Sequence, residues 1–186
     1  MLGENSTALW LTNTWWSETI DPRTNNYFLI DISHVSICGI MLVYAALVWF
    51  IIPYLMRNRE PFNIKKWIII YDFTLVAINF YFFIKTLQLC DWGRELLKWS
   101  DTRDDWSERA FRYIDIAHLY YLSKLVDMID TFFMAFRKRY SQISFLHVWH
   151  HVSLSYAGWL YCRYNPCKYS YHETNICFIY CFDFTI

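Results

Sequence analysis

An apolar run from His34 to Ile52 constrains the fold of this chain more than any other feature of its sequence. The run, HVSICGIMLVYAALVWFII, carries no formal charge and approaches the roughly 20 residues that a helix needs to cross a bilayer. The composition agrees, because 56% of the residues are hydrophobic and 22% are aromatic, more than an ordinary soluble domain contains. No basic stretch followed by an apolar core marks a cleavable signal peptide, so the first spanning helix is expected to direct the chain to the membrane.

Further apolar segments predict an all-α, polytopic membrane fold of about four to five transmembrane helices. The second helix is expected at about residues 67–89, the third at 113–136 and the fourth at 144–162. Residues 175–186 are also apolar but are too few to span. The chain therefore divides into an N-terminal segment, 1–33, a helical part, 34–162, and a C-terminal segment, 163–186.

Two basic clusters predict the orientation. One lies in the loop 57–66 and the other is Arg137 to Arg139. Short loops rich in Lys and Arg stay in the cytosol, which places the N-terminus in the lumen. Asn5, in the triplet Asn-Ser-Thr, is then a candidate glycosylation site.

Charge and cysteine patterns exclude other classes of protein. Lys plus Arg equals Asp plus Glu at 17 each, and no basic face is formed, so nucleic acid is not an expected partner. None of the six cysteines forms a CxxC pair, which excludes the common zinc motifs. Cys90 and Cys167 fall in loops on one side of the membrane, but their spacing does not support a disulfide.

The segment FLHVWHH, residues 145–151, places three imidazoles in an apolar helix. His147, His150 and His151 fall within an arc of about 100° on such a helix. Polar groups of this kind can hold membrane helices together. Imidazole is also a nucleophile, a general base or a metal ligand near neutral pH, which favours a reaction site reached from the cytosol.

The third apolar segment carries a second polar face. Lys124, Asp127, Asp130 and Thr131 share about 120° of a helix. Ionisable residues at this depth are costly, so they are expected either to form a site or to make a structural ion pair, Lys124 with Asp127.

Two chemistries compete for the histidines. Histidine boxes of membrane desaturases bind two irons, which requires about eight ligands, whereas this chain has only six histidines, three of them elsewhere at His34, His118 and His172. We therefore expect no metal and no cofactor. An imidazole can instead attack a thioester and hold its acyl group, or act as a base toward a carbanion.

Two motifs and the sequence between them resemble the fatty acid elongases, the very-long-chain 3-oxoacyl-CoA synthases of the endoplasmic reticulum, and the animal members especially. LHVWHH resembles the family's HxxHH box, and KLVDMIDT, residues 124–131, resembles its KxxExxDT motif. The joining sequence FFMAFRKRYSQISFLH, the DPRT at Asp21 and the triplet Tyr71-Asp72-Phe73 are similar too, so the resemblance covers residues 21 to about 166.

The resemblance implies a seven-helix fold in which six helices surround an acyl tunnel open to the cytosol. The implied reaction condenses acyl-CoA with malonyl-CoA, releases carbon dioxide and gives a 3-oxoacyl-CoA. His150 would be the nucleophile, with His147 and His151 as partners. The implied substrate-binding residues lie across the tunnel or next to the box: Lys124, Asp127, Asp130, Thr131, Arg137 and Lys138. The implied partners are these substrates, membrane lipid, other elongases and the enzymes of the later elongation steps.

The sequence departs from the family pattern at two places. Asp127 stands where the motif has Glu, and after Pro166 the glycine-rich turn and the HxxMYxYY box are not found. We expect the 186 residues by themselves not to elongate fatty acids, because a partial barrel cannot fix its substrates. The alternative function is a non-catalytic membrane protein that pairs with an intact elongase. The preferred length of the acyl chain does not follow from the sequence.

Overall fold

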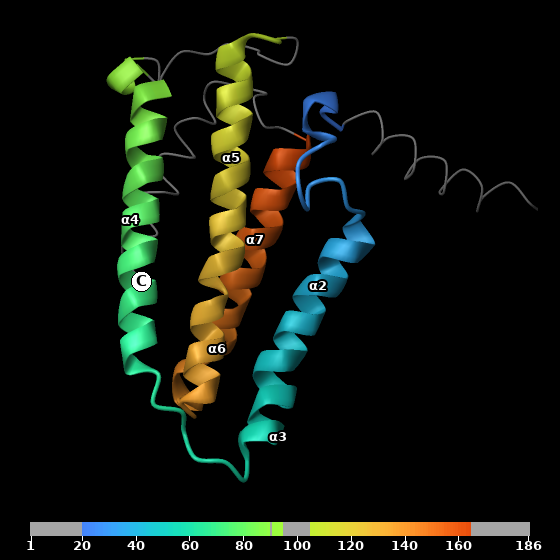
Figure 1. Ribbon diagram of the computed structural model, residues 1–186. Coiled ribbons are helices and arrows are strands. Elements are labelled where there is room, and N and C mark those ends of the chain that lie inside the picture. Colours follow the sequence, from blue (N-terminus) through green and yellow to red (C-terminus); the bar gives the residue numbers. More distant parts are fainter. Residues whose placement is uncertain (1–19, 90, 95–104, 165–186) are drawn as a thin grey trace, which may run out of the picture.

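A computed structural model describes residues 20–89, 91–94 and 105–164, and every regular element within them is helical (Figure 1). The longer helices are α2 (His34–Ala46), α3 (Ile52–Met56), α4 (Lys65–Leu89), α5 (Glu108–Asp127), α6 (Ile129–Phe136) and α7 (Phe145–Tyr164). Short turns occur at η1 (Pro22–Thr24), η2 (Leu47–Ile51), η3 (Asp91–Gly93) and η4 (Tyr140–Gln142).

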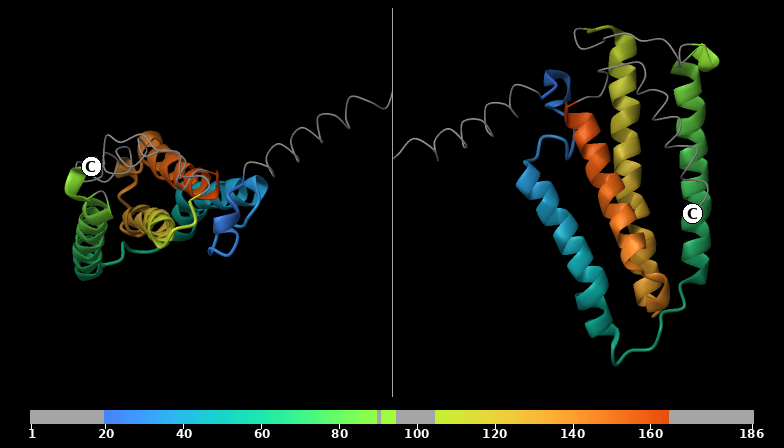
Figure 2. Two further views of the ribbon diagram at one scale, coloured as in Figure 1. Left: turned by 90° about the horizontal axis from the view of Figure 1, so that it is seen from above. Right: turned by 180° about the vertical axis from the view of Figure 1, so that it is seen from behind.

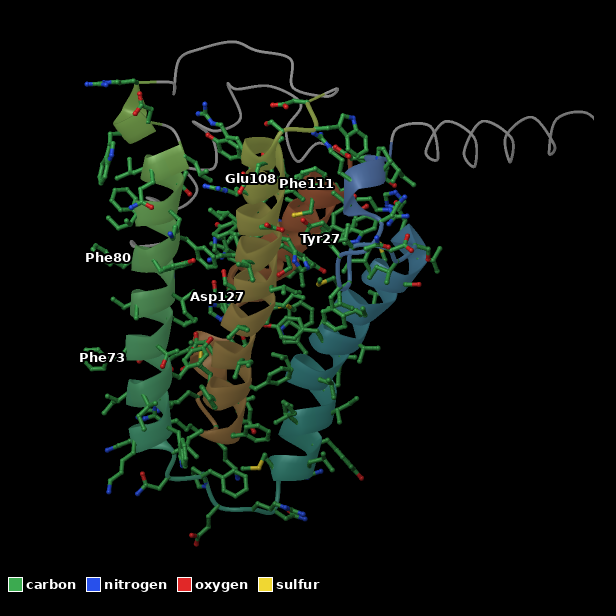
Figure 3. All side chains as sticks on the ribbon, turned by 45° about the horizontal axis from the view of Figure 1, so that its top comes forward. Tyr27, Phe73, Phe80, Glu108, Phe111 and Asp127 are labelled. Atoms are coloured by element: carbon green, nitrogen blue, oxygen red, sulfur yellow. The ribbon has the colours of Figure 1, made fainter. Side chains whose placement is uncertain are left out.

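The apolar outer faces of the helices identify a membrane protein. The continuous stretch His34–Met56 and α4 are both long and apolar enough to cross a bilayer. On α4, Phe73 and Phe80 point away from the other helices and are 73% and 59% exposed (Figure 3). Exposed aromatic side chains of this size are stable when lipid surrounds them. The predicted all-α polytopic membrane fold is confirmed.

The first helix continues past Pro53, where the sequence predicted its end. A π-helical turn, η2, precedes the proline, and the amide of Ile52 donates to the carbonyl of Leu47, five residues earlier. Pro53 follows in the first turn of α3, and the wider π-helical turn before it accommodates the proline ring and its missing N–H. The helix therefore reaches Met56.

The third apolar segment forms two helices instead of one. It begins at Glu108, where the Ser107 hydroxyl accepts a hydrogen bond from the Ala110 amide at 3.2 Å and caps the helix. The segment breaks at Met128, between α5 and α6. Ser155 of α7 donates to the Lys124 carbonyl at 3.4 Å, which is the acceptor that a regular helix would offer to Met128. A side chain from α7 thus occupies the ladder at the break.

The core lies between α2, α5 and α7. Tyr121 of α5 and Trp159 of α7 are fully buried in it, together with Ile37 of α2. Gly158 of α7 faces Tyr121 of α5, and a Cβ atom at Gly158 would meet Cδ2 of Tyr121 at 3.4 Å, an ordinary contact with little space beyond it. Helix α4 packs mainly against α5 and stands apart from α2 in both views (Figures 1 and 2).

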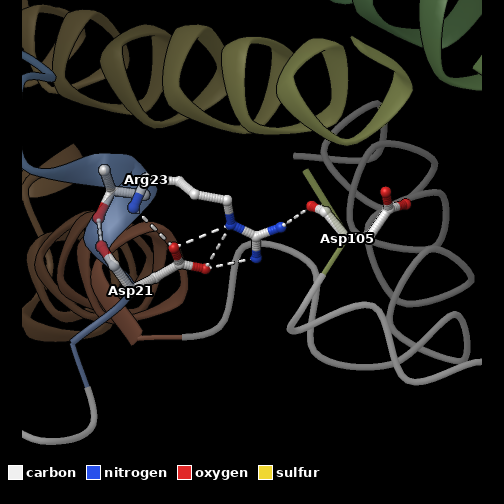
Figure 4. Close-up of polar contacts among 4 residues, drawn as sticks. Asp21, Arg23 and Asp105 are labelled. Atoms are coloured by element: carbon white, nitrogen blue, oxygen red, sulfur yellow. Dashed lines mark hydrogen bonds and ion pairs between the residues drawn. The ribbon is translucent and has the colours of Figure 1, made fainter. Parts of the chain in front are cut away.

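The short turn η1, capped by Asp21, joins the N-terminal segment to one end of the bundle. The guanidinium of Arg23, which is 6% exposed, bonds the Asp21 carboxylate at 2.6 Å and the Asp105 carbonyl at 2.6 Å (Figure 4). The Asp21 amide donates to the Arg163 carbonyl at the end of α7. Nε2 of His34 lies 2.7 Å from the hydroxyl of Tyr164, and this hydrogen bond links α2 to α7.

The two basic clusters meet at the opposite end. Nζ of Lys138 lies 3.5 Å from the carbonyl of Arg57, and the Phe62 amide donates to the carbonyl of Phe136 at 3.2 Å. The loop between α3 and α4 is thereby fixed to the end of α6.

Candidate functional site

A pocket of about 430 Å³ opens between α4, the α5–α6 junction and α7. Its lining residues come from all three parts of the bundle: Tyr71, Asp72, Leu75, Val76, Asn79, Lys124, Asp127, Asp130, Met134, His147, His150, His151 and Leu154. Six of the residues selected from the sequence therefore face one space.

The three histidines enter the pocket from the first two turns of α7. The ring of His151 lies edge-on to both others, with centroids 4.6 Å from His147 and 5.8 Å from His150. Ser144 caps the helix by accepting from the amide of His147 at 3.1 Å. Each ring is partly buried, so the apolar residues beside the histidines limit the water that reaches them.

Lys124 and Asp127 form an ion pair on the opposite wall. Their atoms Nζ and Oδ2 are 2.6 Å apart, and the side chains are 4% and 18% exposed. The ion pair that the sequence offered as the structural explanation for these residues is therefore present. The same two residues also line the pocket. Asp127 projects from α5 on the side that faces α4 (Figure 3).

Thr131 lies behind this wall and touches a histidine. Its side chain is fully buried, and Oγ1 lies 3.1 Å from Nε2 of His147. The same oxygen accepts a hydrogen bond from the hydroxyl of Tyr44, on α2, at 2.7 Å. Sequence reasoning selected Thr131 and missed Tyr44, because nothing around a tyrosine in an apolar helix marks it.

Helix α4 closes the third side. The hydroxyl of Tyr71 donates to the carbonyls of Val126 and Asp127, at 3.0 and 3.2 Å, where α5 ends. The adjacent Asp72 lines the pocket. The Tyr71-Asp72-Phe73 triplet therefore supplies one residue that docks α4 and one that adds charge to the pocket.

Three of the lining residues could hold a metal ion. Asp130, His147 and His151 each offer one ligand atom, and these atoms lie within 4.8 Å of one another. Two histidines and one carboxylate form a typical open site for a divalent transition metal.

Comparison with known proteins assigns the chain to a family. Residues 30–182 match the ELO, or GNS1/SUR4, family. The chain belongs to this family. The predicted membership of the fatty acid elongases is thereby confirmed.

Named elongases are among the relatives of this ELO-family chain. It is 31% identical over 156 residues to very long chain fatty acid elongase 5 of Tachysurus fulvidraco, which covers 84% of the chain and 52% of that protein. It is 35% identical over 145 residues to elongase 7 of Rattus norvegicus, covering 77% and 51%. With elongase 1 of Mus musculus it shares 33% over 141 residues, covering 75% and 50%. The chain spans about half the length of these curated relatives.

Three residues predicted for the ELO-family site, Thr131, Arg137 and Lys138, are not among those that line the pocket. Arg137 and Lys138 follow α6, at the end of the bundle where α7 begins. Asn5 lies outside the described residues, as do Cys90 and Cys167.

A second hollow, of about 860 Å³, lies between α4 and α5 and differs in chemistry. Its described lining is aliphatic and aromatic apart from Thr74 and Ser123, and contains no acidic, basic or histidine side chain. Among these residues no histidine, carboxylate or amine is available as a general base for acyl transfer.

Proposed function

We propose that this chain carries the site at which a fatty acid elongase of the endoplasmic reticulum membrane condenses a long-chain acyl-CoA with malonyl-CoA to a 3-oxoacyl-CoA. One observation carries the proposal: the three histidines, Asp130 and the Lys124–Asp127 pair line one pocket of a chain that belongs to the ELO family. Membership supports the reaction class, and the pocket supplies a nucleophile with acid and base partners beside it.

The first step is acyl transfer to His150. Its imidazole attacks the thioester carbonyl, the carbon–sulfur bond breaks, and coenzyme A leaves as a thiol with the proton released from the ring. His151, whose ring centroid is 5.8 Å away, is close enough to relay that proton. The product of this step is an acyl-imidazole.

The second step forms the new carbon–carbon bond. Malonyl-CoA loses carbon dioxide, and the resulting carbanion attacks the acyl carbonyl on His150. The carbon–nitrogen bond breaks, the ring takes up a proton from water, which replaces the one that left with coenzyme A, and the 3-oxoacyl-CoA departs. Lys124 and Asp130, on the facing wall, orient the polar part of the substrate. Arg137 and Lys138 bind the phosphates of coenzyme A from the end of the bundle.

Orientation follows from the same arrangement. The two basic clusters lie together at the end where α7 begins, and the histidines lie in the first two turns of that helix. We assign this end to the cytosol and the N-terminus to the lumen, since basic loops remain cytosolic.

Adduct formation tests the site by itself. The chain, purified in lipid nanodiscs, is incubated with a long-chain acyl-CoA, and its peptides are mapped by mass spectrometry. We expect an acyl group on His150 that is absent in His150→Ala. An unmodified protein, or an adduct on another residue, overturns the proposal. Addition of labelled malonyl-CoA then reports whether the bound acyl group is lengthened.

A metal at Asp130, His147 and His151 would give the pocket a competing chemistry. In the proposed reaction the imidazoles need their lone pairs, so a chelator is expected to leave adduct formation unchanged and added Zn²⁺ to inhibit it. Loss of the adduct after chelation, with recovery on adding metal, would support a metal-dependent reaction instead.

The second candidate function is a non-catalytic one, in which the chain pairs with an intact elongase. The exposure of α4 favours this function. Of the most apolar 18 residues of α4, only 6% are buried by the described part of the chain, so a large apolar face is open to a partner helix. Co-purification with an intact elongase, together with no acyl adduct on the chain, would support this function over the condensation.

A further inference from the structure

Tyr44 lies outside both sequence motifs but is hydrogen-bonded to Thr131, which contacts His147 of the pocket. It lies on α2, is 4% exposed, and packs edge-on against Phe132 with ring centroids 5.5 Å apart. Its hydroxyl meets the hydroxyl of Thr131 at 2.7 Å, in a contact that is buried on both sides. A phenol placed in an apolar helix usually finds such a partner, and here the partner is itself bonded to a histidine.

The direction of this chain of hydrogen bonds is fixed by counting hydrogens. Tyr44 donates its hydrogen to Oγ1 of Thr131, which leaves the hydrogen of Thr131 to find another acceptor. Within the described part of the chain, the other recorded contact of Oγ1 is Nε2 of His147, at 3.1 Å. If Nε2 carried a hydrogen instead, two donors would point at Oγ1 and the buried hydrogen of Thr131 would have no acceptor, which is costly.

We propose that Tyr44 is a positioning residue that holds His147, through Thr131, as the tautomer with its hydrogen on Nδ1. The tautomer is argued from geometry alone, while its consequence for catalysis rests on the proposed function. Tyr44 donates to Thr131, Thr131 donates to Nε2, and the remaining hydrogen of the neutral ring is on Nδ1.

This arrangement separates the roles of the histidines. The lone pair of Nε2 in His147 is occupied by Thr131, so His147 does not compete with His150 for the acyl group. Its ring stays edge-on to His151 at 4.6 Å and keeps that ring in place. Partners that fix the tautomer of a metal-bound histidine typically change affinity or activity by about 10- to 100-fold when removed, and we expect an effect of the same order for His147.

The test reads the tautomer directly and requires no substrate. The chain is labelled with ¹⁵N-histidine in nanodiscs at alkaline pH, and the signals of His147 are identified by their loss in His147→Gln. We expect Nδ1 to carry the hydrogen in the unchanged chain. In Tyr44→Phe, Thr131 becomes free to accept from Nε2, so the signal is expected to shift toward the other tautomer.

Two further variants separate positioning from folding. Thr131→Ser keeps the hydroxyl and is expected to retain the Nδ1–H tautomer, whereas Thr131→Val removes the hydroxyl and is expected to lose it. Tyr27→Phe is the matched control, because it removes another tyrosine hydroxyl, which links the segment before α2 to Asp115 of α5 at 2.5 Å, at the other end of the bundle from the start of α7. Its histidine signals should match those of the unchanged chain.

The outcomes distinguish this inference from the proposed function. A hydrogen on Nε2 of His147 in the unchanged chain, or a tautomer that Tyr44→Phe does not alter, overturns the inference whether or not acyl transfer occurs. If the tautomer depends on Tyr44 but no adduct forms on His150, the positioning role stands and the condensation is wrong. If both hold, the rate of adduct formation in Tyr44→Phe should fall about 10- to 100-fold with the adduct still on His150.

Discussion

Nζ of Lys124 lies 2.6 Å from Oδ2 of Asp127, one helical turn further along the chain, with both side chains largely withdrawn from solvent. An ammonium and a carboxylate in such a position stabilise the fold only as a pair, because either charge alone is poorly solvated. The pair therefore links the stability of the α5–α6 junction to the chemistry of the pocket.

Lys124→Met should destabilise the chain by about 3 to 5 kcal/mol, because it leaves the carboxylate of Asp127 without its cation. The double variant Lys124→Met with Asp127→Leu should recover most of this loss, since no isolated charge remains. Thermal unfolding in detergent measures both. Arg112→Met is the control: its exposed pair with Glu108 should contribute far less. Equal destabilisation by the single and double variants would contradict the argument.

Asp127→Glu should be tolerated, because it keeps the charge and restores the residue that the elongase motif has at this position. The added methylene moves the carboxylate further into a pocket of about 430 Å³, and Lys124 can follow it with its own flexible side chain. The unfolding temperature and the yield of folded protein should stay close to those of the unchanged chain. Failure to fold would show that the junction has packed around the shorter acid.

The membrane helices could be predicted from the sequence because long apolar runs have few alternatives, but their interruptions could not. The apolar run predicts a helix that ends at Ile52, before Pro53, whereas a π-helical turn before the proline continues the helix to Met56. At the break beside Met128, the hydroxyl of Ser155 donates to the carbonyl of Lys124. These two residues are 31 positions apart, so no local sequence pattern reveals the contact. Both errors arise where a distant or unusual hydrogen bond replaces the regular ladder.

The site divides in the same way. Lys124, Asp130 and His150 could be selected because ionisable residues are rare inside apolar runs, and a helical spacing places them on shared faces. Tyr44 could not, since it is one of 15 tyrosines and its partner Thr131 is 87 residues away. The contact depends on how α2 packs against α6, and no pattern in the sequence shows that packing.

Gly158→Ala should be neutral or slightly stabilising, and Gly158→Leu clearly destabilising. A Cβ atom at this position meets Cδ2 of Tyr121 at 3.4 Å, which is an ordinary contact, and alanine favours a helix over glycine by about 1 kcal/mol. A leucine extends further into the same place and must separate α5 from α7. Unfolding temperatures of the two variants test this, and equal values would mean that the helices are not closely packed at Gly158.

Lys138→Gly should stabilise the chain by about 1 kcal/mol, because Lys138 has a φ of 57° in the left-handed region that favours glycine. The amides of Lys138 and Arg139 donate to the carbonyls of Ala135 and Met134, which is the usual termination of a helix by glycine. Lys138→Ala removes the same charge but keeps Cβ, and it should give no gain. If Lys138 also binds coenzyme A phosphates, both variants should raise KM for the acyl-CoA.

The final prediction concerns the side of the membrane at which each end of the bundle lies. Asn58→Cys, in the loop between α3 and α4, and Asn26→Cys, beside η1, place matched exposed thiols at opposite ends of the bundle in a chain whose own cysteines are replaced. In sealed microsomes, a membrane-impermeant maleimide should label Asn58→Cys at once and Asn26→Cys only after detergent, since the basic clusters beside Asn58 favour the cytosol. A tag at Met1 should likewise be protected from added protease. Labelling of Asn26→Cys in sealed microsomes, with Asn58→Cys protected, would mean that the orientation is reversed. The end of the bundle where α7 begins, with its histidines, would then face the lumen, away from cytosolic acyl-CoA.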